Sequence, residues 1–318
     1  MLRFRRSAAL GQTFWITVFT LLLISALSLV SDRFGSHENW YNISRNAAFI
    51  AIMTLGQTVV IISGGIDLAV GSVMGLAGVV TALSLEQGYP LELAIFLGLL
   101  AGGICGLVNG YLISHLKLSS FVVTLGMLSI ARSVALVISN NRMIYEFGQA
   151  HNEFVGLGAL DLFGLAMPVI VSAVLGIVVS YLLKQTVWGR HVYAVGGNQE
   201  ASRLNGVMVE RVKLLAYLFS SLCAGLSGVL TVAWLGSAST SLGTGYELTV
   251  IAAAVIGGAS LAGGFGGAWG ALIGALLVEV IRNGLLLTGV DPYWQGSFVG
   301  CCIILAVLIE GMKKWRGA

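Results

Sequence analysis

The residues of this chain that could do chemistry are few, and the most informative stretch lies between two long apolar runs. Gly64-Gly65-Ile66-Asp67 places two glycines and a carboxylate there. The glycines would break a helix and free backbone polar groups, which is tolerated at membrane depth only inside protein or beside a watery cavity. Asp67 would be costly against lipid and needs a partner. The stretch predicts a gate or hinge, and capping of the next helix by Asp67 is a compatible structural alternative.

A second polar stretch covers residues 188–207 and contains Gly196-Gly197-Asn198. Asn198 is placed to cap a short helix that contains Ala201 to Leu204 and that Gly206 ends. A short, capped helix of mixed charge suits docking to a soluble partner. An ordinary solvated loop is the plainer interpretation of the same residues.

Charged residues inside apolar runs are further candidates. Glu279 and Arg282 lie one helical turn apart and are expected to pair. As intramembrane charges they are either site residues or a structural ion pair, and Arg132 and Glu247 pose the same question. The 4 histidines fall at predicted helix ends and loops, which argues against a proton relay.

No pattern typical of catalysis or of a bound cofactor accompanies these residues. The cysteines lie in apolar runs without a Cys-x-x-Cys spacing, which favours small buried hydrophobes over a metal site or a disulfide framework. The glycine-rich segment 257–267 resembles a phosphate loop only superficially, because no lysine in the chain is followed by Ser or Thr. We therefore expect no catalytic residue, no metal and no cofactor in this chain, and a tight turn with packing glycines at 257–267.

The composition indicates what must position these residues. Of 318 residues, 57% are hydrophobic and 10% charged, whereas soluble domains carry about a quarter charged residues. The natural solvent of such a chain is lipid. The 43 glycines with only 3 prolines favour closely packed helices. A formal charge of +3 gives no indication of a nucleic-acid partner.

Apolar runs of about 20 residues are needed to cross a membrane. The sequence predicts an all-α, polytopic helix bundle with spans near 13–30, 43–62, 68–85, 93–115, 121–139, 166–184, 213–235, 246–262, 268–287 and 295–312. Basic residues before the first span and after the last place both termini in the cytoplasm, which agrees with this even number. The chain is then one transmembrane domain, 1–318, with a basic cytoplasmic loop at 185–212.

Two Asn-Gly pairs hint at an internal repeat. Asn109-Gly110 and Asn283-Gly284 each precede a turn and an apolar span that contains a phenylalanine, Phe121 in the first case. If spans two to five correspond to spans seven to ten, the two halves run in opposite directions, as in inverted-repeat transporters.

The order and spacing of several stretches are similar to those of the ribose, xylose and galactose type of permease in bacterial ABC importers. The resemblance runs from about residue 43 to 312. The matching stretches are GGIDLAVGS at 64–72, NG at 109–110, FVVTLG at 121–126, WGRHVYAVGGNQEASRLNGV at 188–207, GYEL at 245–248, VIGGASLAGGFGG at 255–267 and NG at 283–284. Ala69 stands where such permeases usually have serine.

The resemblance implies a permease that does no covalent chemistry in the bacterial inner membrane. Its partners would be cytoplasmic ATP-binding cassette subunits that bind ATP and Mg²⁺, a periplasmic solute-binding protein, and a second permease copy or homologue. The cargo would be a monosaccharide, with a nucleoside, an autoinducer sugar or a branched-chain amino acid as alternatives. An ion-coupled secondary transporter is the alternative from another class.

Two groups of residues follow as candidates. The coupling segment on the ATPase would contain Gly196, Gly197, Asn198, Glu200, Ala201, Arg203, Leu204 and Gly206. The passage or its gate would contain Gly64, Gly65, Asp67, Asn109, Phe121, Thr124, Glu247 and Asn283.

Overall fold

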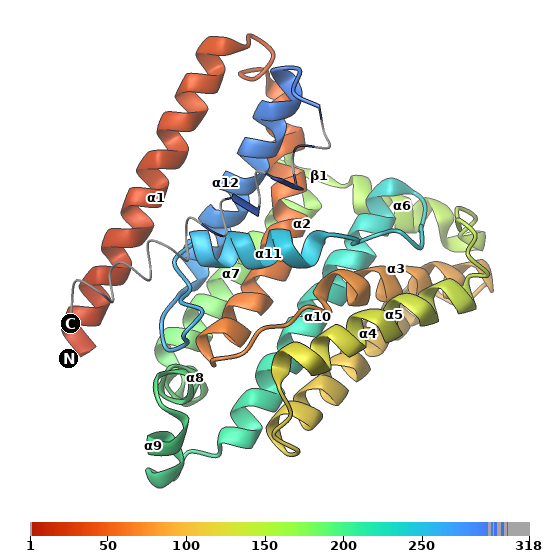
Figure 1. Cartoon of the computed structure of the whole chain (residues 1–318). Helices are drawn as coiled ribbons and strands as arrows, with labels where there is room; N and C mark the ends of the chain where they lie inside the picture. Colours follow the sequence, from red (N-terminus) through yellow and green to blue (C-terminus); the bar gives the residue numbers. More distant parts are fainter. Residues whose placement is uncertain (1, 292–293, 295, 298–299, 302–303, 305–318) are drawn as a thin grey trace.

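The computed structural model describes residues 2–291, 294, 296–297, 300–301 and 304, with the side chains of 2–12 left out. Within these residues the chain is mostly helical (Figure 1). The helices are α1 (Leu2–Val30), α2 (His37–Ile62), α3 (Val70–Glu86), α4 (Leu91–Ser114), α5 (Ser120–Ile138), α6 (His151–Ala159), α7 (Met167–Gln185), α8 (Val187–Gly197), α9 (Gln199–Leu204), α10 (Val209–Leu235), α11 (Tyr246–Ile256) and α12 (Ala268–Leu287). A 3-10 turn (Gly148–Ala150) precedes α6, and a small antiparallel hairpin of β1 (Asp161–Leu162) and β2 (Leu165–Ala166) follows it.

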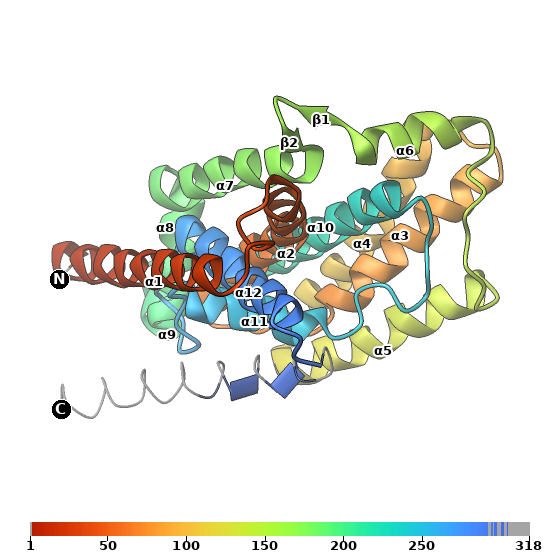
Figure 2. The same cartoon turned by 90° about the horizontal axis from the view of Figure 1, so that it is seen from above.

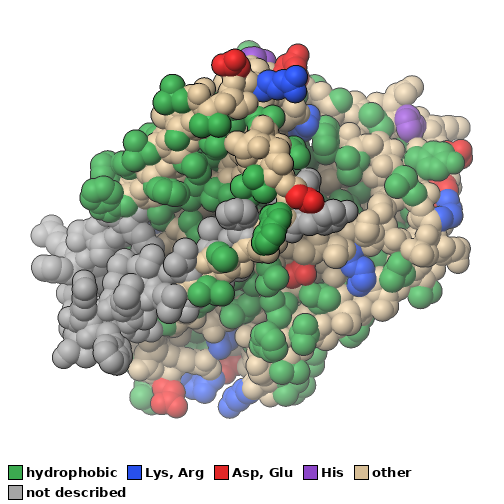
Figure 3. Space-filling model, turned by 45° about the horizontal axis from the view of Figure 1, so that its top comes forward, with side chains coloured by type: hydrophobic (Ala, Val, Ile, Leu, Met, Phe, Trp, Pro, Cys, Tyr) green, Lys and Arg blue, Asp and Glu red, His purple; other side chains and the backbone are tan. Residues whose placement is uncertain are grey.

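The predicted polytopic helix bundle is confirmed. Among the described residues, 7 helices are long and apolar enough to cross a membrane, namely α1, α2, α4, α5, α7, α10 and α12, and the apolar helices α3 and α11 are shorter. Nine of the expected spans fall on these helices, whereas the tenth, 295–312, lies mostly outside the described residues. Figure 3 shows most charged side chains gathered toward opposite ends of the molecule, with hydrophobic ones between.

One boundary differs from the prediction. The span expected at 246–262 is helical only as far as Ile256, where Gly257 and Gly258 follow and Gly258 takes a φ of 100°. The 11 residues of α11 rise about 16 Å, roughly half of the hydrocarbon thickness. The remainder of the expected span is an irregular loop that leads to α12, because the glycines there permit turns that a helix does not make.

Helices α2 and α10 form the centre of the bundle and are buried along most of their length. The glycine ridge of α4 lets it approach α10 closely, since a Cβ on Gly106 would meet Leu218 and Ser221, and one on Gly110 would meet Leu214. Small residues serve this purpose in membrane bundles, where dispersion replaces the hydrophobic effect between helices. Cys105 and Cys223 are buried and free, as expected, but Cys301 is exposed.

The helix contacts support the predicted inverted repeat. Helix α10 packs on α3 and α4, and α2 packs in the same way on α11 and α12. Helices α3 and α4 contact each other, as do α11 and α12. The central pair, α2 and α10, run in opposite directions in Figure 1. Each central helix therefore packs on the second and third helices of the other group, as a repeat that relates α2–α4 to α10–α12 requires.

The bundle has two distinct ends. Helices α8 and α9 project from the same end as the beginning of α1, and we call this the inner end (Figure 1). Helix α6 lies at the opposite, outer end, and the β-hairpin lies at the edge of the molecule beside α7 (Figure 2). The two candidate groups from the sequence can now be placed on these ends.

Candidate functional site

The break between α2 and α3, residues 63–69, depends on glycine. Helix α2 ends at Ile62 and α3 begins at Val70. Gly64 adopts a φ of 83°, in the region that side chains disfavour. A Cβ on Gly65 would collide with the hydroxyl of Tyr217 from α10. The predicted interruption is thus present, and Gly65 allows α10 to approach it.

Asp67 lies in this break and is fully buried. Its Oδ1 accepts a hydrogen bond of 2.9 Å from the amide of Ala69, and its Oδ2 accepts one of 3.0 Å from the hydroxyl of Ser220. The side-chain amide of Gln57 faces the Asp67 backbone, donating to the carbonyl at 3.1 Å and accepting from the amide at 3.2 Å. Asp67 therefore closes a turn just before α3, and α2 and α10 hold it from both sides. It does not cap α3 as expected, because the N-cap residue is Ala69, which has no side-chain capping bond.

The carbonyl of Ile66 ties the same break to two further helices. Tyr217 Oη of α10 donates to it at 3.4 Å, and Thr124 Oγ1 of α5 lies 3.5 Å away. Thr124 was among the sequence candidates, whereas Gln57, Tyr217 and Ser220 were not. Their signal in the sequence was a polar residue within an apolar span, which alone does not indicate a partner.

Three glycine pairs meet at the inner end, Gly64-Gly65, Gly196-Gly197 and Gly263-Gly264, and we call them the glycine junction. The Gly264 amide donates to the carbonyl of Ile62 at 2.8 Å. A Cβ on Gly196 would overlap that carbonyl oxygen, and one on Gly263 would lie 3.0 Å from the Gly64 Cα. The break, the end of α8 and the α11–α12 loop therefore pack backbone against backbone.

The same contact explains the glycine-rich segment 257–267. It is a tight interhelical turn, as predicted, but it also receives the Tyr193 hydroxyl of α8, which donates to the carbonyl of Gly266 at 2.8 Å. The sequence showed paired glycines in three separate stretches without indicating that they meet. Nothing in their spacing along the chain contains that information.

The short helix predicted after Asn198 is α9. Asn198 Oδ1 accepts from the Ala201 amide at 2.9 Å, and Gly206 follows the helix with a φ of 80°. Glu200 is exposed, and the side chain of Leu204 is 89% exposed. Arg203 instead pairs within the chain, with Glu210 at 2.6 Å. Helix α9 thus presents an acidic and an apolar side chain away from the bundle.

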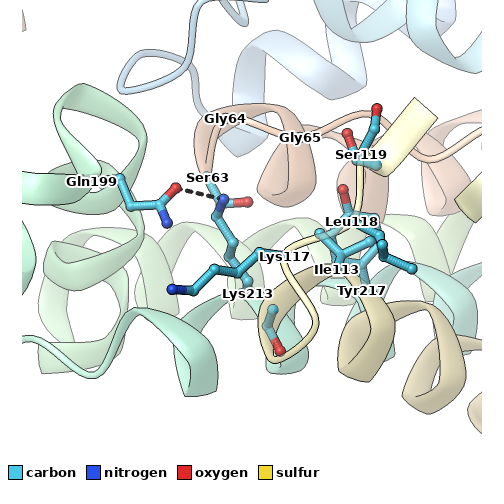
Figure 4. A pocket seen from close by; sticks show the side chains of 12 residues that line it. Ser63, Gly64, Gly65, Ile113, Lys117, Leu118, Ser119, Gln199, Lys213 and Tyr217 are labelled. Carbon is cyan, nitrogen blue, oxygen red and sulfur yellow. Dashed lines mark hydrogen bonds between the residues drawn. The ribbon is translucent and has the colours of Figure 1, made fainter. Parts of the chain in front are cut away.

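A cavity of about 330 Å³ separates α9 from the break (Figure 4). Gly64 and Gly65 form part of its wall, with Lys117 from the α4–α5 turn and Gln199 and Lys213 from α9 and α10. Lys213 Nζ donates to Gln199 Oε1 at 2.8 Å, so α9 is bound to α10 beside this cavity. The candidate coupling segment and the candidate gate therefore face a common space.

Glu247 belongs to a second group, nearer the outer end. It lies in the first turn of α11, and its carboxylate faces Gly71 at the start of α3. Arg132 of α5 donates to the carbonyls of Thr240 and Leu242 at 2.6 and 2.8 Å, and so holds the α10–α11 loop. Arg132 is therefore a structural tie for this loop.

The remaining sequence candidates lie apart from both groups. Asn109 is completely buried in α4, and neither atom of its side-chain amide has a hydrogen-bond partner. Asn283 exchanges two hydrogen bonds with Asn39, at 2.8 and 3.1 Å, which join α12 to α2. The predicted contact of Arg282 with Glu279 is present at 3.9 Å. Phe121 is 54% exposed at the start of α5.

Within the described residues, no group of three or more His, Cys, Asp or Glu side chains is arranged to hold a metal ion. The functional candidates described above are a helix break with a hydrogen-bonded carboxylate, a junction of glycines and a projecting short helix.

Comparisons with known proteins extend this picture. The family described as the permease component of branched-chain amino acid transport systems matches residues 39–307. The chain is 40% identical to a probable ABC transporter permease of Sinorhizobium fredii, over 93% of this chain and 88% of the relative. It is 38% identical to a ribose import permease of Escherichia coli over 92% of both chains, and 36% identical to a fructose import permease of Rhizobium meliloti over 93% of this chain and 84% of the relative. No solved structure matches the chain.

Proposed function

The chain belongs to the family of permease components of branched-chain amino acid transport systems, and on this premise we propose that it is the membrane-spanning subunit of an ATP-driven sugar importer. The family and the apolar helices make it a multi-pass protein of the bacterial inner membrane. A sugar is the preferred cargo because relatives covering most of the chain are named as import permeases for ribose, D-allose and fructose. A branched-chain amino acid, from the description of the family, is the second candidate.

The glycine junction is the observation that carries the coupling part of the proposal. A cytoplasmic ATPase would bind the exposed side chains of α9 within the loop 185–212, and ATP and Mg²⁺ would bind to that partner. Asn198 at the start of α9 directly follows Gly196-Gly197, which pack on the break and on the α11–α12 loop. A tilt of α9 would thus be transmitted to both segments without a side chain in between.

The other partners follow from the same type of machine. A periplasmic solute-binding protein would deliver the cargo to the outer end, and a second permease copy or homologue would complete the passage. Both chain termini would then lie in the cytoplasm. The inner position of the start of α1, on the same end as α9, supports this orientation (Figure 1).

Reconstitution tests the function directly. Vesicles that contain the permease, its ATPase and a cognate binding protein should take up labelled ribose when ATP is supplied to the ATPase side. An ion gradient without ATP should give no uptake. Uptake driven by the gradient alone would contradict the proposal and favour a secondary transporter, and uptake of leucine but not ribose would favour the second cargo.

The docking surface needs a separate test. Glu200→Lys should reduce co-purification with the ATPase, because this exposed carboxylate makes no ion pair within the described part of the chain. Arg203 is a poorer choice, since its replacement also breaks the bond to Glu210. Leu204→Ser should weaken the complex as well. Undiminished co-purification of both variants, with normal folding, would rule out α9 as the contact.

A further inference from the structure

The β1–β2 hairpin has an unusual turn. Its strands pair Asp161 with Ala166 and Leu162 with Leu165, which leaves Phe163 and Gly164 as a two-residue loop. Both take positive φ, 59° and 78°. Two-residue hairpin loops with positive φ at both positions are type I′ turns, which favour Asn, Asp or Gly. A phenylalanine in the first position brings backbone strain that those residues would avoid.

The Phe163 side chain makes no contact with the described residues of the protein that would offset this strain. Its side chain is 102% exposed, and the neighbouring Leu162 and Leu165 are 40% and 46% exposed. The hairpin would fold at least as well with Asn in this position, because its geometry already depends on Gly164 and on Asp161 Oδ1, which accepts from the Gly164 amide at 2.7 Å. The aromatic ring therefore serves a contact outside the chain.

The depth of the hairpin indicates what that contact is. Strand β2 packs on α2 and leads directly into Met167, the first residue of the spanning helix α7. Asp161 lies close to Tyr41 in the first turns of α2. Nearby, the Arg45 guanidinium lies 4.0 Å from the Trp234 ring centroid. Tyr and Trp gather at the level of the lipid headgroups, so the hairpin lies at that level.

Its lateral position agrees with a lipid contact. Seen from above, the hairpin lies at the edge of the molecule, outside α2 and beside α7 (Figure 2). The exposed residues Val174, Ile177 and Tyr181 continue along α7, which is typical of a helix facing lipid. Asp161, the one charged residue between Leu160 and Met167 in the sequence, accepts a hydrogen bond from the Gly164 amide and lies close to Tyr41.

We propose that the Phe163 hairpin is an interfacial anchor, with its aromatic side chain inserted at the headgroup boundary of the outer lipid leaflet. The partner is the lipid surface itself. Burial of an exposed aromatic side chain at that boundary stabilises the attachment and fixes the depth of α7 beside it. This inference uses only the membrane location of the chain and is independent of the cargo and of the ATPase.

Photo-crosslinking tests the anchor in the full chain. The photoreactive residue p-benzoylphenylalanine is placed at position 163, at Val174 on α7 as a lipid-facing control, and at the exposed Asn152 on α6 as an aqueous control. In vesicles of phosphatidylethanolamine and phosphatidylglycerol, position 163 should give roughly tenfold more lipid adduct than position 152. A yield no higher than that of position 152 overturns the proposal. So does a cross-link in native membranes to a periplasmic protein in place of lipid.

A second pair of variants separates the anchor from a role in folding. Phe163→Trp should add a fluorescence component, above the 7 native tryptophans, that lipids brominated near the headgroup quench and aqueous iodide does not. Phe163→Asn should leave the thermal unfolding temperature in detergent unchanged or raised, since Asn suits the turn. Quenching by iodide alone, or a lowered unfolding temperature for Phe163→Asn, would contradict the anchor.

Discussion

The two groups of helices in the repeat, α2–α4 and α10–α12, differ in the segment that connects their first two helices. Between α2 and α3, the 63–69 break is short, and Asp67 within it is fully buried. Between α10 and α11, the 236–245 loop is longer and mostly accessible, with Ser241, Thr244 and Gly245 exposed. The first is held by contacts that surround it, and the second by Arg132, by the backbone bridge of Ile144 with Ala238, and by close backbone packing of Gly243 on Gly71 of α3.

This difference indicates a division of labour between the two ends. The inner break contacts α5, α8, α10 and the α11–α12 loop at once, so it moves only with its neighbours. The outer loop contacts mainly α3, α5 and the segment that follows α5. Substitutions at the inner break should therefore affect both folding and transport, and those at the outer loop should affect local mobility first.

The largest effect is expected at the glycine junction. Gly196→Ala puts a methyl group onto the Ile62 carbonyl, so the junction must open, at a cost of about 1–3 kcal/mol or more. Thermal unfolding in detergent and ATP-driven uptake should both be impaired. Gly197→Ala is the matched control, because its Cβ would meet no atom within 4 Å. Equal behaviour of the two variants would show that the junction is not closely packed.

Asp67→Asn should have the second largest effect. The amide keeps the shape of the carboxylate, and Ser220 can turn its hydroxyl toward it, so expression should be close to normal. Loss of the charge that anchors the two donors should lower uptake by roughly tenfold. Normal uptake would leave Asp67 with a structural role in the turn before α3 only, and the inner break would then tolerate more than the comparison implies.

Arg132→Gln tests the outer loop. The substitution removes the two hydrogen bonds to the carbonyls of Thr240 and Leu242, and the freed carbonyls can turn to water because the loop is largely accessible. Faster hydrogen exchange or proteolysis within 236–245 is expected, with a smaller shift in unfolding temperature than for Gly196→Ala. Arg132→Lys, which keeps the charge, should show exchange and proteolysis rates between those of the unchanged protein and Arg132→Gln. A global loss of stability as large as that of Gly196→Ala would remove the contrast between the ends.

The smallest effect is expected for Arg142→Gln. Arg142 forms a bidentate pair with Glu86 at 2.6 and 2.7 Å, but half of its side chain is exposed. Hydrogen bonding to Glu86 raises the pKa of Arg142, so the pair stays charged at neutral pH. Exposed ion pairs contribute little to stability because solvent screens them, and uptake should be unchanged. A strong transport defect would show that the outer rim takes part in function.

The sequence predicted the helices better than it predicted the contacts between them. Helix positions followed from apolar runs, and the capped helix α9 followed from Asn198 and Gly206, because both signals are local. Gln57, Tyr217 and Ser220 were missed because a lone polar residue in an apolar span does not reveal which residue it faces. The length of α11 was overestimated because apolar residues continue past Gly257-Gly258, although the helix does not. Asn283 was grouped with the gate but joins α12 to α2.

The glycine junction also limits how such a permease can diversify. A contact made of backbone alone has no rotamers to repack, so no nearby substitution can compensate for a change there. On the proposed coupling, adaptation to a different ATPase would take place on the exposed side chains of α9, such as Glu200 and Leu204, while the contact behind them stays fixed. Partner choice and force transmission would then be separable properties of adjacent residues, and a chimaera that exchanges only residues 199–205 should inherit the first without disturbing the second.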